Sequence, residues 1–431
     1  MHRTAVVAFV GAVACASTLA QSGSSDDVVV DQSDNPVRIA LATSAGQAKI
    51  GAAGSWAVYN RNTADLVTRG TSDETLTIQL RGRRLVAVRA SGSATSAYTG
   101  PFIIRSRTPG SFLSYGGKRY RGEIIITPKD DGLLVVNRLG VESYLRGVVP
   151  NEIGKRPPGE EAAVEAQAVA ARSYAYTHMA DAGNRGFDMF GSVQDQDYGG
   201  VDAENPMSDA AVATTANMVL KYAGRVISAP YHSTCGGSTA AVSEVWWRQP
   251  DQPYLRPVSD KIPGTDSYYC DRSGRFRWTV TLDGDQLKST LEKYLGSVTT
   301  ASEPPVAASA AASHPLSLGR ITGFRILGRT PSDRVAAVSI QTDRGSYNVR
   351  GNDVRFVLRT ATGGLLSSTY FTAEATPGAN GEITSLVLRG GGYGHGIGMC
   401  QFGAMGRARA GQDYKTILTT YYPGTTVGRI D

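Results

Sequence analysis

The first part of the chain alternates short apolar and polar runs in a way that predicts β-strands. Between residues 37 and 135 these runs are separated by Gly, Asn and Asp, the residues that favour turns. They read VRIALA, SWAVYN, TLTIQL, RLVAVRA, PFIIRS, EIIITP and LLVVNRL. We therefore expect a largely antiparallel β-region here.

The spacing of apolar residues along the chain changes after Val141. The segment ESYLRGVVPNEI is short and apolar, and KRPPGEE follows it as a turn, so we expect a strand to run toward Glu152 and a helix to leave the turn. The next segment, EEAAVEAQAVAARSYAYTHMADAG, has helical periodicity, with Pro158 near its start and Gly183 at its end. One face carries mostly small residues: Ala166, Val169, Ala170, Ser173, Tyr174 and Thr177.

Beyond this helix the pattern predicts short elements of both kinds. We expect a second helix at Asp209–Asn217, then two short strands that turn at Ala223–Gly224. Residues 301–314 are of low complexity and are expected to form a flexible segment before another β-rich stretch. The C-terminal part predicts a strand, a glycine-rich loop and a helix. The predicted fold class is α+β, dominated by strands and with a few short helices.

Composition narrows the function classes. The chain has 431 residues, 41% of them hydrophobic, and a formal net charge of +6. It has no run of Lys and Arg of the kind that binds nucleic acid, so nucleic acid is not an expected partner. A mild positive charge suits an anionic polymer such as the cell wall.

The N-terminus predicts export. Residues 1–20 combine a basic start, an apolar run and small residues, which is typical of a signal peptide cleaved near Ala20. The alternative is a lipoprotein anchored through Cys15. Residues 21–36 are expected to be disordered, and no later run is long enough to predict a transmembrane helix.

Three cysteines remain after the signal peptide: Cys235, Cys270 and Cys400. In an exported protein an odd number predicts one disulfide and one free thiol, and the candidate pair is Cys235 and Cys270. The spacing matches no zinc ribbon or finger, so we expect no metal and no cofactor.

Two charged residues are candidates for chemistry. Glu152 lies beside Pro150 and an apolar GVV segment, where a partly dry pocket would raise its pKa to that of a general acid. The alternative is a glutamate that only accepts hydrogen bonds from backbone amides near a helix. Arg172 is the one cation on an apolar helix segment, so it is either exposed or paired with an anion.

Two loops carry the remaining candidates. In YHSTCGGST, Tyr231, His232, Ser233, Thr234 and Cys235 precede a Gly-Gly turn. This loop fits a Cys/His nucleophile pair, half of a metal site, or a polar substrate loop, and we favour the last. In GGGYGHGIGMCQFGA, Gly392, Gly394, Gly396 and Gly398 surround His395, which predicts positive φ angles or close backbone approach. The loop has no P-loop pattern.

Taken in order, these segments resemble the stage II sporulation protein D (SpoIID) family, which includes the LytB amidase enhancers. The resemblance rests on five segments spread over about 120–427: YRGEIIITPKDDGLLVVNRLGVESYLRGVVPNEI, EAQAVAARSYA, YHSTCGGSTA, GHGIGMCQFGA and YKTILTTYYPGT. It implies a β-rich N-terminal region at 37–115 and a SpoIID-like domain at 116–427, with an insertion at about 300–390.

The family implies a peptidoglycan lytic transglycosylase that acts on glycan strands without stem peptides. One carboxyl group protonates the oxygen between MurNAc and GlcNAc and then deprotonates the MurNAc 6-hydroxyl, which gives a 1,6-anhydro end. Glu152 matches the family's catalytic position. The resemblance gives substrate-binding roles to Arg172, Tyr198, Tyr231, His232, Ser233, Thr234, His395 and Gln401, and for Arg172 the alternative role is to hold Glu152.

Two further expectations follow. Some relatives bind zinc where this chain reads Gln194, Asp195, Gln196, Asp197 and Tyr198, so no zinc is expected at this loop. The alternative functions are a non-catalytic wall-binding protein that stimulates an N-acetylmuramoyl-L-alanine amidase, and a Cys235-dependent hydrolase.

Overall fold

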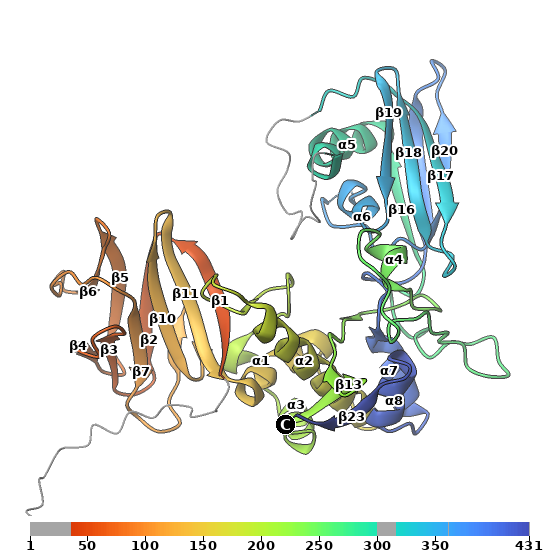
Figure 1. The fold of residues 1–431 in the computed structure, drawn as a ribbon. Coiled ribbons are helices and arrows are strands. Elements are labelled where there is room, and N and C mark those ends of the chain that lie inside the picture. Colours follow the sequence, from red (N-terminus) through yellow and green to blue (C-terminus); the bar gives the residue numbers. More distant parts are fainter. Residues whose placement is uncertain (1–35, 300–315, 361, 431) are drawn as a thin grey trace, which may run out of the picture.

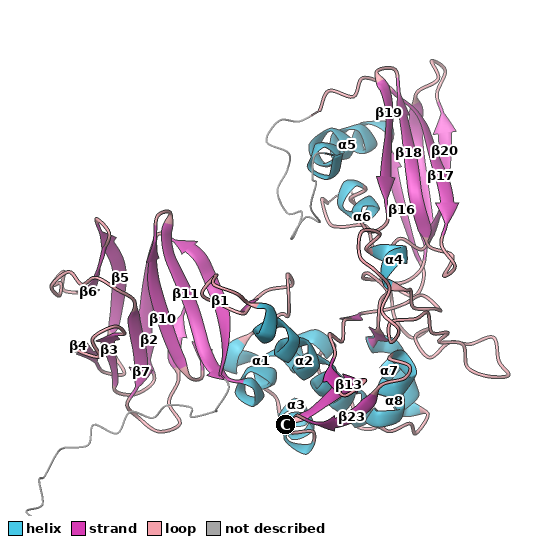
Figure 2. Ribbon diagram, viewed as in Figure 1, coloured by secondary structure: helices cyan, strands magenta, loops and turns pink. Residues whose placement is uncertain are grey.

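The computed structural model describes residues 36–299, 316–360 and 362–430. The predicted signal peptide with Cys15, nearly all of the predicted disordered N-terminus and the low-complexity stretch 301–314 lie outside these residues. Strands in several sheets dominate and helices are fewer, so the predicted α+β class is confirmed (Figures 1 and 2).

Two sheets form the N-terminal part of the structure. One has the strand order β12-β1-β11-β10-β7-β3-β4 and the other the order β6-β5-β2-β8-β9. Their bounds are β1 Pro36–Ala45, β2 Gln47–Ala52, β3 Trp56–Asn60, β4 Leu66–Gly70, β5 Thr75–Arg81, β6 Arg84–Arg89, β7 Phe102–Ser106, β8 Leu113–Tyr115, β9 Lys118–Tyr120, β10 Glu123–Lys129, β11 Gly132–Gly140 and β12 Met189–Phe190. Alternate side chains of these strands form a buried core, as the sequence pattern predicts.

This β-region continues beyond the boundary at residue 115 that the sequence predicts. β10 pairs with β7, and β11 pairs with β1 from Pro36 to Ala45. These pairings join residues far apart in the sequence, and strand alternation alone cannot reveal them.

A group of helices lies beside these sheets, the first of them next to the strands and the last two on the side away from the strands (Figure 1). They are α1 Val141–Ile153, α2 Glu161–Asp181, α3 Pro206–Thr214, α7 Gln401–Arg409 and α8 Tyr414–Tyr421, with a short 3-10 turn at Gly200–Ala203. Beside them lies a small sheet of β14 Arg225–Val226, β13 Met218–Tyr222 and β23 Thr426–Arg429. The predicted helix after residue 160 is confirmed as α2. The segment before Glu152, expected to be a strand, is instead helix α1, because its apolar residues Tyr144, Leu145, Val148 and Val149 lie at helical spacing and are buried.

A short parallel pair joins two remote segments. In this pair β15 (Tyr231–His232) lies beside β22 (Met399–Cys400), with Tyr231 opposite Met399. Helix α4 (Val242–Val245) follows β15. The polar loop after β15 and the glycine loop before β22 are therefore neighbours.

A second hydrophobic core lies in a separate part of the chain (Figure 1). Its elements are β16 Trp278–Asp283, α5 Gly284–Thr299, β17 Ile321–Arg329, β18 Val335–Thr342, β19 Gly345–Arg350, α6 Asp353–Val357, β20 Phe371–Pro377 and β21 Ile383–Gly390. They form the sheets β16-β21-β20 and β17-β18-β19. Residues on both sides of 301–314 share this core, so that stretch does not separate two halves as the sequence suggested, and the inserted unit already includes Trp278.

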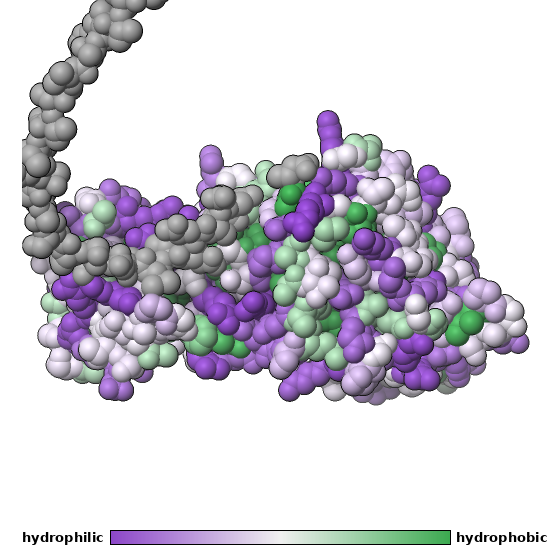
Figure 3. Space-filling view, turned by 90° about the horizontal axis from the view of Figure 1, so that it is seen from below, coloured by the Kyte–Doolittle hydropathy of each residue, from purple (hydrophilic) through white to green (hydrophobic). Residues whose placement is uncertain are grey.

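Within the described ranges, no helix is both long and apolar enough to cross a membrane. The face seen in Figure 3 is mainly polar, and its apolar residues are scattered in small groups.

Candidate active site around Glu152

Glu152 occupies the last turn of α1, and its side chain is only partly exposed. The helix ends at Gly154, whose positive φ of 73° a residue with a Cβ would rarely adopt. Oε1 of Glu152 accepts a hydrogen bond of 2.8 Å from the backbone amide of Asp197. The loop after β12 therefore fixes the orientation of the carboxyl group.

The surroundings raise the pKa of Glu152 from 4.5 to about 7. Burial is the main cause, because it disfavours the charged form. The Asp197 amide opposes the rise, the negative charge of Asp197 adds to it, and the Tyr231 hydroxyl opposes it by hydrogen bonding to the carboxylate. A carboxyl group with this pKa is present in both protonation states near neutral pH, as a group that first donates and then accepts a proton requires.

Tyrosines and one glutamine organise the side chains around Glu152. The buried Gln196 donates to the Tyr231 hydroxyl at 3.0 Å and accepts from the Tyr144 hydroxyl at 3.1 Å. Because Gln196 donates to it, Tyr231 has its own proton available for Glu152. The Tyr174 hydroxyl donates to Asp195 at 3.1 Å. This network connects α1, α2, β15 and the loop at 194–198.

The glycine loop at 392–398 and the residues directly after it also support the site. Gly392, Gly394, Gly396 and Gly398 all have positive φ, and an added Cβ on Gly398 would lie 2.0 Å from the carbonyl oxygen of Pro230. The glycine loop therefore has both features that the sequence predicted, positive φ angles and a close approach to another backbone segment. Next to them Gln401, the first residue of α7, donates to the backbone oxygen of Glu152 at 3.0 Å and to Gln167 at 3.2 Å.

His395 fixes the backbone of Tyr231. Its Nδ1 accepts from the amide of Ile397 at 3.1 Å, so the proton is on Nε2, which donates to the Tyr231 carbonyl oxygen at 2.9 Å. Burial and the nearby Arg355 lower the pKa of His395 to about 3, so the ring is neutral. Its hydrogen bonds make it a positioning residue.

Arg172 is not placed to bind substrate or to hold Glu152, which corrects the sequence-based prediction. It is fully buried and forms a two-pronged ion pair with Glu142, through Nε at 2.7 Å and Nη2 at 2.6 Å. It also donates to the carbonyl oxygens of Met218 and Val212. The expectation of an anionic partner is correct, but the partner is the glutamate at the start of α1.

Four other predicted substrate contacts are buried: Tyr198, His232, Thr234 and Gln401, the last of which holds the Glu152 backbone. Tyr198 packs against Tyr144 and donates to Asn137 at 2.9 Å, so it belongs to the core. Thr234 bonds to Ser273 at 2.7 Å. His232 bonds through Nδ1 to the carbonyl oxygen of Ile397, and burial lowers its pKa to about 4. Among the predicted loop residues, Tyr231 and Ser233 remain partly exposed.

The cysteines are also buried. The sulfurs of Cys235 and Cys270 lie 3.5 Å apart with both thiols free, so the disulfide stays a prediction. Cys235 is 1% exposed, which leaves no path for a substrate to reach its sulfur, and the Cys235-dependent hydrolase finds no support.

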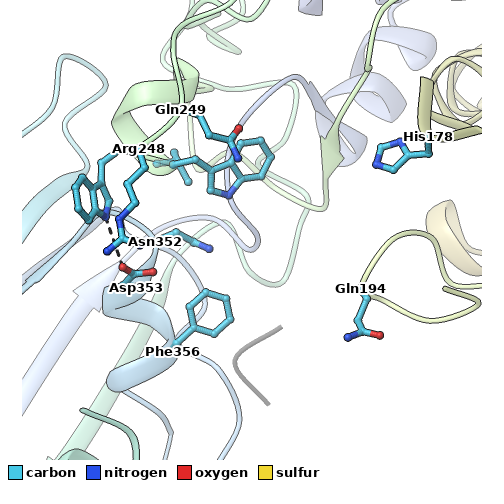
Figure 4. A pocket seen from close by; sticks show the side chains of 10 residues that line it. His178, Gln194, Arg248, Gln249, Asn352, Asp353 and Phe356 are labelled. Carbon is cyan, nitrogen blue, oxygen red and sulfur yellow. Dashed lines mark hydrogen bonds between the residues drawn. The ribbon is translucent and has the colours of Figure 1, made fainter. Parts of the chain in front are cut away.

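A cavity of about 400 Å³ lies beside the Glu152 site (Figure 4). Figure 4 shows His178 and Gln194 on one side of it and Arg248, Gln249, Asn352, Asp353 and Phe356 on the other. Val245, Trp246 and Trp247 also line it. His178 stacks on Tyr174 at 3.8 Å, and Trp246 packs on His395 at 5.2 Å. The cavity and the Glu152 site therefore share supporting residues, although Glu152 does not line the cavity.

Sequence reasoning missed several of these residues. Gln196, Tyr174 and Trp246 were not assigned roles, because their partners come from segments that only the fold brings together. A signal was present for Gln196, which lies in the QDQDYGG loop next to Tyr198.

Two segments of the chain match known protein families. Residues 129–222, which contain Glu152 and Gln196, match the family model "Stage II sporulation protein". Residues 264–398 match a domain of unknown function (DUF8618), which covers the part of the chain that contains the second core.

Several curated proteins are similar over most of this chain. An uncharacterized protein of Brachyspira hyodysenteriae is 30% identical over 316 residues, which are 73% of this chain and 74% of that protein. The amidase enhancer of Bacillus subtilis is 32% identical over 308 residues, 66% of this chain but 40% of the relative. Stage II sporulation protein D of the same species is 26% identical over 311 residues, 69% of this chain and 76% of the relative.

The matched family model and the named relatives thus define a SpoIID-type protein, and the matched segment contains the partly exposed Glu152. The chain belongs to the SpoIID/LytB family.

Proposed function

We propose that this chain is an exported lytic transglycosylase that acts on peptidoglycan glycan strands without stem peptides, with Glu152 as general acid and base. The observation that carries this proposal is the partly exposed Glu152 carboxyl with a pKa of about 7, held by the Asp197 amide. A role in the cell wall is also supported by the names of the relatives, stage II sporulation protein D and amidase enhancer.

The reaction needs one carboxyl group. Neutral Glu152 donates its proton to the oxygen between C1 of MurNAc and GlcNAc, and the C1–O bond breaks as the GlcNAc hydroxyl leaves. The Glu152 carboxylate then takes the proton of the MurNAc 6-hydroxyl, whose oxygen bonds to C1. The proton has returned to Glu152, no water is consumed, and the product has a 1,6-anhydro end.

Three neighbours adjust this proton transfer. The Asp197 amide and the Tyr231 hydroxyl stabilise the carboxylate that forms after the first step. Burial and the Asp197 charge favour the protonated form that starts the reaction. Gln401 holds the backbone of Glu152, so the carboxyl group keeps its position through both steps.

The cavity with Trp246 and Trp247, beside the Glu152 site, has side chains that suit a sugar chain. Aromatic faces cover the apolar faces of sugar rings, and Gln194, Gln249 and Asn352 offer polar groups for the hydroxyls. Trp247 is 40% exposed, and the guanidinium groups of Arg248 and Arg350 lie over its ring at 4.5 and 5.7 Å, so stacking of a sugar there requires these side chains to move.

The test uses glycan strands prepared with an amidase and mass spectrometry of the products. Wild type is expected to form anhydro ends and Glu152→Gln to form none. Glu165→Gln is the matched control, since Glu165 is a half-buried glutamate on the neighbouring helix α2 and has no assigned contact with the site. Anhydro ends from Glu152→Gln at the wild-type rate would refute the assignment.

A second candidate function has its own support. The relative from Bacillus subtilis at 32% identity is named an amidase enhancer, which favours a non-catalytic protein that binds strands and stimulates an N-acetylmuramoyl-L-alanine amidase. In that case wild type would bind strands without forming anhydro ends, and its addition would raise the rate of amidase cleavage.

A further inference from the structure

Four buried side chains from separate segments meet below the polar loop. They are Cys235 after β15, Cys400 at the end of β22, and Asp260 and Cys270 from the loop between α4 and β16. All four are at most 1% exposed. We propose that these three thiolates and one carboxylate bind a single zinc ion in a closed structural site.

The spacing of the ligand atoms fits a tetrahedral ion. The three sulfurs and one carboxylate oxygen all lie within 4.8 Å of one another. Zinc bonds of about 2.3 Å to sulfur and about 2.1 Å to oxygen place two sulfurs about 3.8 Å apart and a sulfur and an oxygen about 3.6 Å apart. The Cys235 and Cys270 sulfurs are 3.5 Å apart, and Cys235 Sγ is 3.3 Å from Asp260 Oδ2.

Asp260 is oriented as a ligand would be. Its Oδ1 accepts from the Tyr421 hydroxyl at 2.6 Å and from Arg407 at 3.2 Å. This leaves Oδ2 pointing toward the sulfurs. Outer hydrogen bonds that fix one oxygen while the other faces the ion are the usual support of a metal-binding carboxylate.

Backbone amides point at the sulfurs. The amides of Cys235 and Gly403 lie 3.2 and 3.3 Å from Cys400 Sγ, and the amide of Gly237 lies 3.4 Å from Cys235 Sγ. Cys400 is the N-cap of α7, where the helix dipole favours a negative charge. These donors stabilise thiolates, the form in which cysteine binds zinc.

The surrounding charges balance such a site. Three thiolates, one carboxylate and one Zn²⁺ sum to two negative charges. Arg407 bonds to Asp260, and the fully buried Arg334 bonds to the carbonyl oxygen of Cys235 at 3.1 Å, so two positive charges lie beside the cluster.

Compared with the zinc site, a disulfide between Cys235 and Cys270 leaves the positions of Asp260 and Cys400 unexplained. It would remove the Cys235 thiol, whose hydrogen is donated to Asp260 Oδ2. That oxygen would then face sulfurs without a donor in a fully buried place, at a cost in free energy. The zinc site satisfies Oδ2 and uses Cys400 as well, and it replaces the sequence-based expectations of no metal and one disulfide.

A zinc ion in this site would hold together the two loops near Glu152, the loop after Tyr231 and the loop before Gln401. Cys235 directly follows Thr234 in the loop after Tyr231, and Cys400 directly precedes Gln401, which holds the Glu152 backbone. One ion therefore would fix both loops relative to each other. The sequence does not reveal the site because its ligands lack the close pairwise spacing of zinc fingers and ribbons.

The primary experiment measures metal and thiols in the full wild-type chain, purified without a metal-binding tag. Mass spectrometry of the metals is expected to give about one zinc per chain. Alkylation after unfolding in chelator without reductant is expected to modify Cys235, Cys270 and Cys400. Absence of zinc, iron in its place, or a Cys235–Cys270 disulfide that blocks alkylation would each overturn the proposal.

Variants then test the ligands. Cys400→Ser and Asp260→Asn are expected to lose most of the zinc and to lower the Tm. Asp188→Asn is the matched control, because Asp188 is also a buried aspartate paired with an arginine, Arg38, but lies in the N-terminal sheet region. Cobalt added to metal-free wild type should give the thiolate-to-cobalt absorption band. Full zinc in both ligand variants, or no such band, would contradict the site independently of any catalytic activity.

Discussion

The backbone amide of Asp197 donates to Oε1 of Glu152, and its side chain at the same time raises the pKa of that carboxyl group by its charge. The backbone amide of Asp197 thus stabilises the Glu152 carboxylate, whereas the negative charge of the Asp197 side chain destabilises it. The balance, with burial as the largest contribution, leaves Glu152 with a pKa of about 7.

We expect two substitutions to shift the pH dependence in opposite directions. The general acid must start protonated, so the rate of anhydro-end formation should fall as the pH rises through about 7. Asp197→Asn removes a negative charge and should move this limb to lower pH. Tyr231→Phe removes a hydrogen bond to the carboxylate and should move it to higher pH. Limbs that stay in place in both variants would show that Glu152 does not control the rate.

Glu152→Gln is expected to raise the stability at alkaline pH. The folded pKa of about 7 exceeds the unfolded value of 4.5, so the folded state binds the proton more tightly. The contribution of Glu152 to stability is therefore fully present below about pH 4.5 and is lost as the pH rises through 7. Since the side chain is partly exposed, we expect the variant to gain on the order of 1–2 kcal/mol at pH 8.

Urea unfolding at two pH values measures this effect. The gain of the variant should be present at about pH 8 and should disappear at about pH 4. An equal difference at both pH values would mean that the ionisation of Glu152 is not the cause.

Glu142→Ala should reduce stability without changing the pH limb of the activity. It leaves the buried Arg172 without its carboxylate, and because Glu142 itself is 37% exposed the cost should be below the about 3 kcal/mol of a fully buried ion pair. Glu374→Ala is the control, since its pair with Arg389 is exposed and should cost less than about 1 kcal/mol. A shift of the pH limb in Glu142→Ala would restore a link between Arg172 and the catalytic site.

Trp247→Ala is expected to weaken binding of glycan strands about ten-fold, because Trp247 lines the cavity. The pH dependence of anhydro-end formation should stay unchanged, because Trp247 does not contact Glu152. Fluorescence polarisation with labelled strands measures the Kd. Leu327→Ala, an exposed apolar residue on β17, is the control and should bind as wild type does. Equal affinities of both variants would remove the cavity from the proposed strand path.

The sequence predicted local structure better than the contacts between remote segments. The periodicity of α2 and the positive φ angles of the glycine loop follow from residue types, and the structure confirms both. Helix α1 was missed because its apolar run is short and contains Pro150, which resembles a turn signal. The role of Arg172 was misjudged because Glu142 and Glu152 lie on the same helix and only the packing selects between them.

The three cysteines show most clearly that contacts between remote segments could not be predicted from the sequence. Their number led to the prediction of a disulfide, whereas their meeting with Asp260 depends on the parallel pairing of β15 with β22. That pairing joins residues 231–232 to residues 399–400, and no local pattern encodes it.

The central claim, that Glu152 alone closes a 1,6-anhydro ring, is tested most directly by digestion of peptide-free strands in water labelled with a heavy oxygen isotope. We predict products that are lighter by one water than hydrolysis products and carry no label, formed by wild type and Glu165→Gln but not by Glu152→Gln. Labelled reducing ends from wild type would show hydrolysis instead, and unlabelled anhydro ends from Glu152→Gln would show that another group transfers the proton.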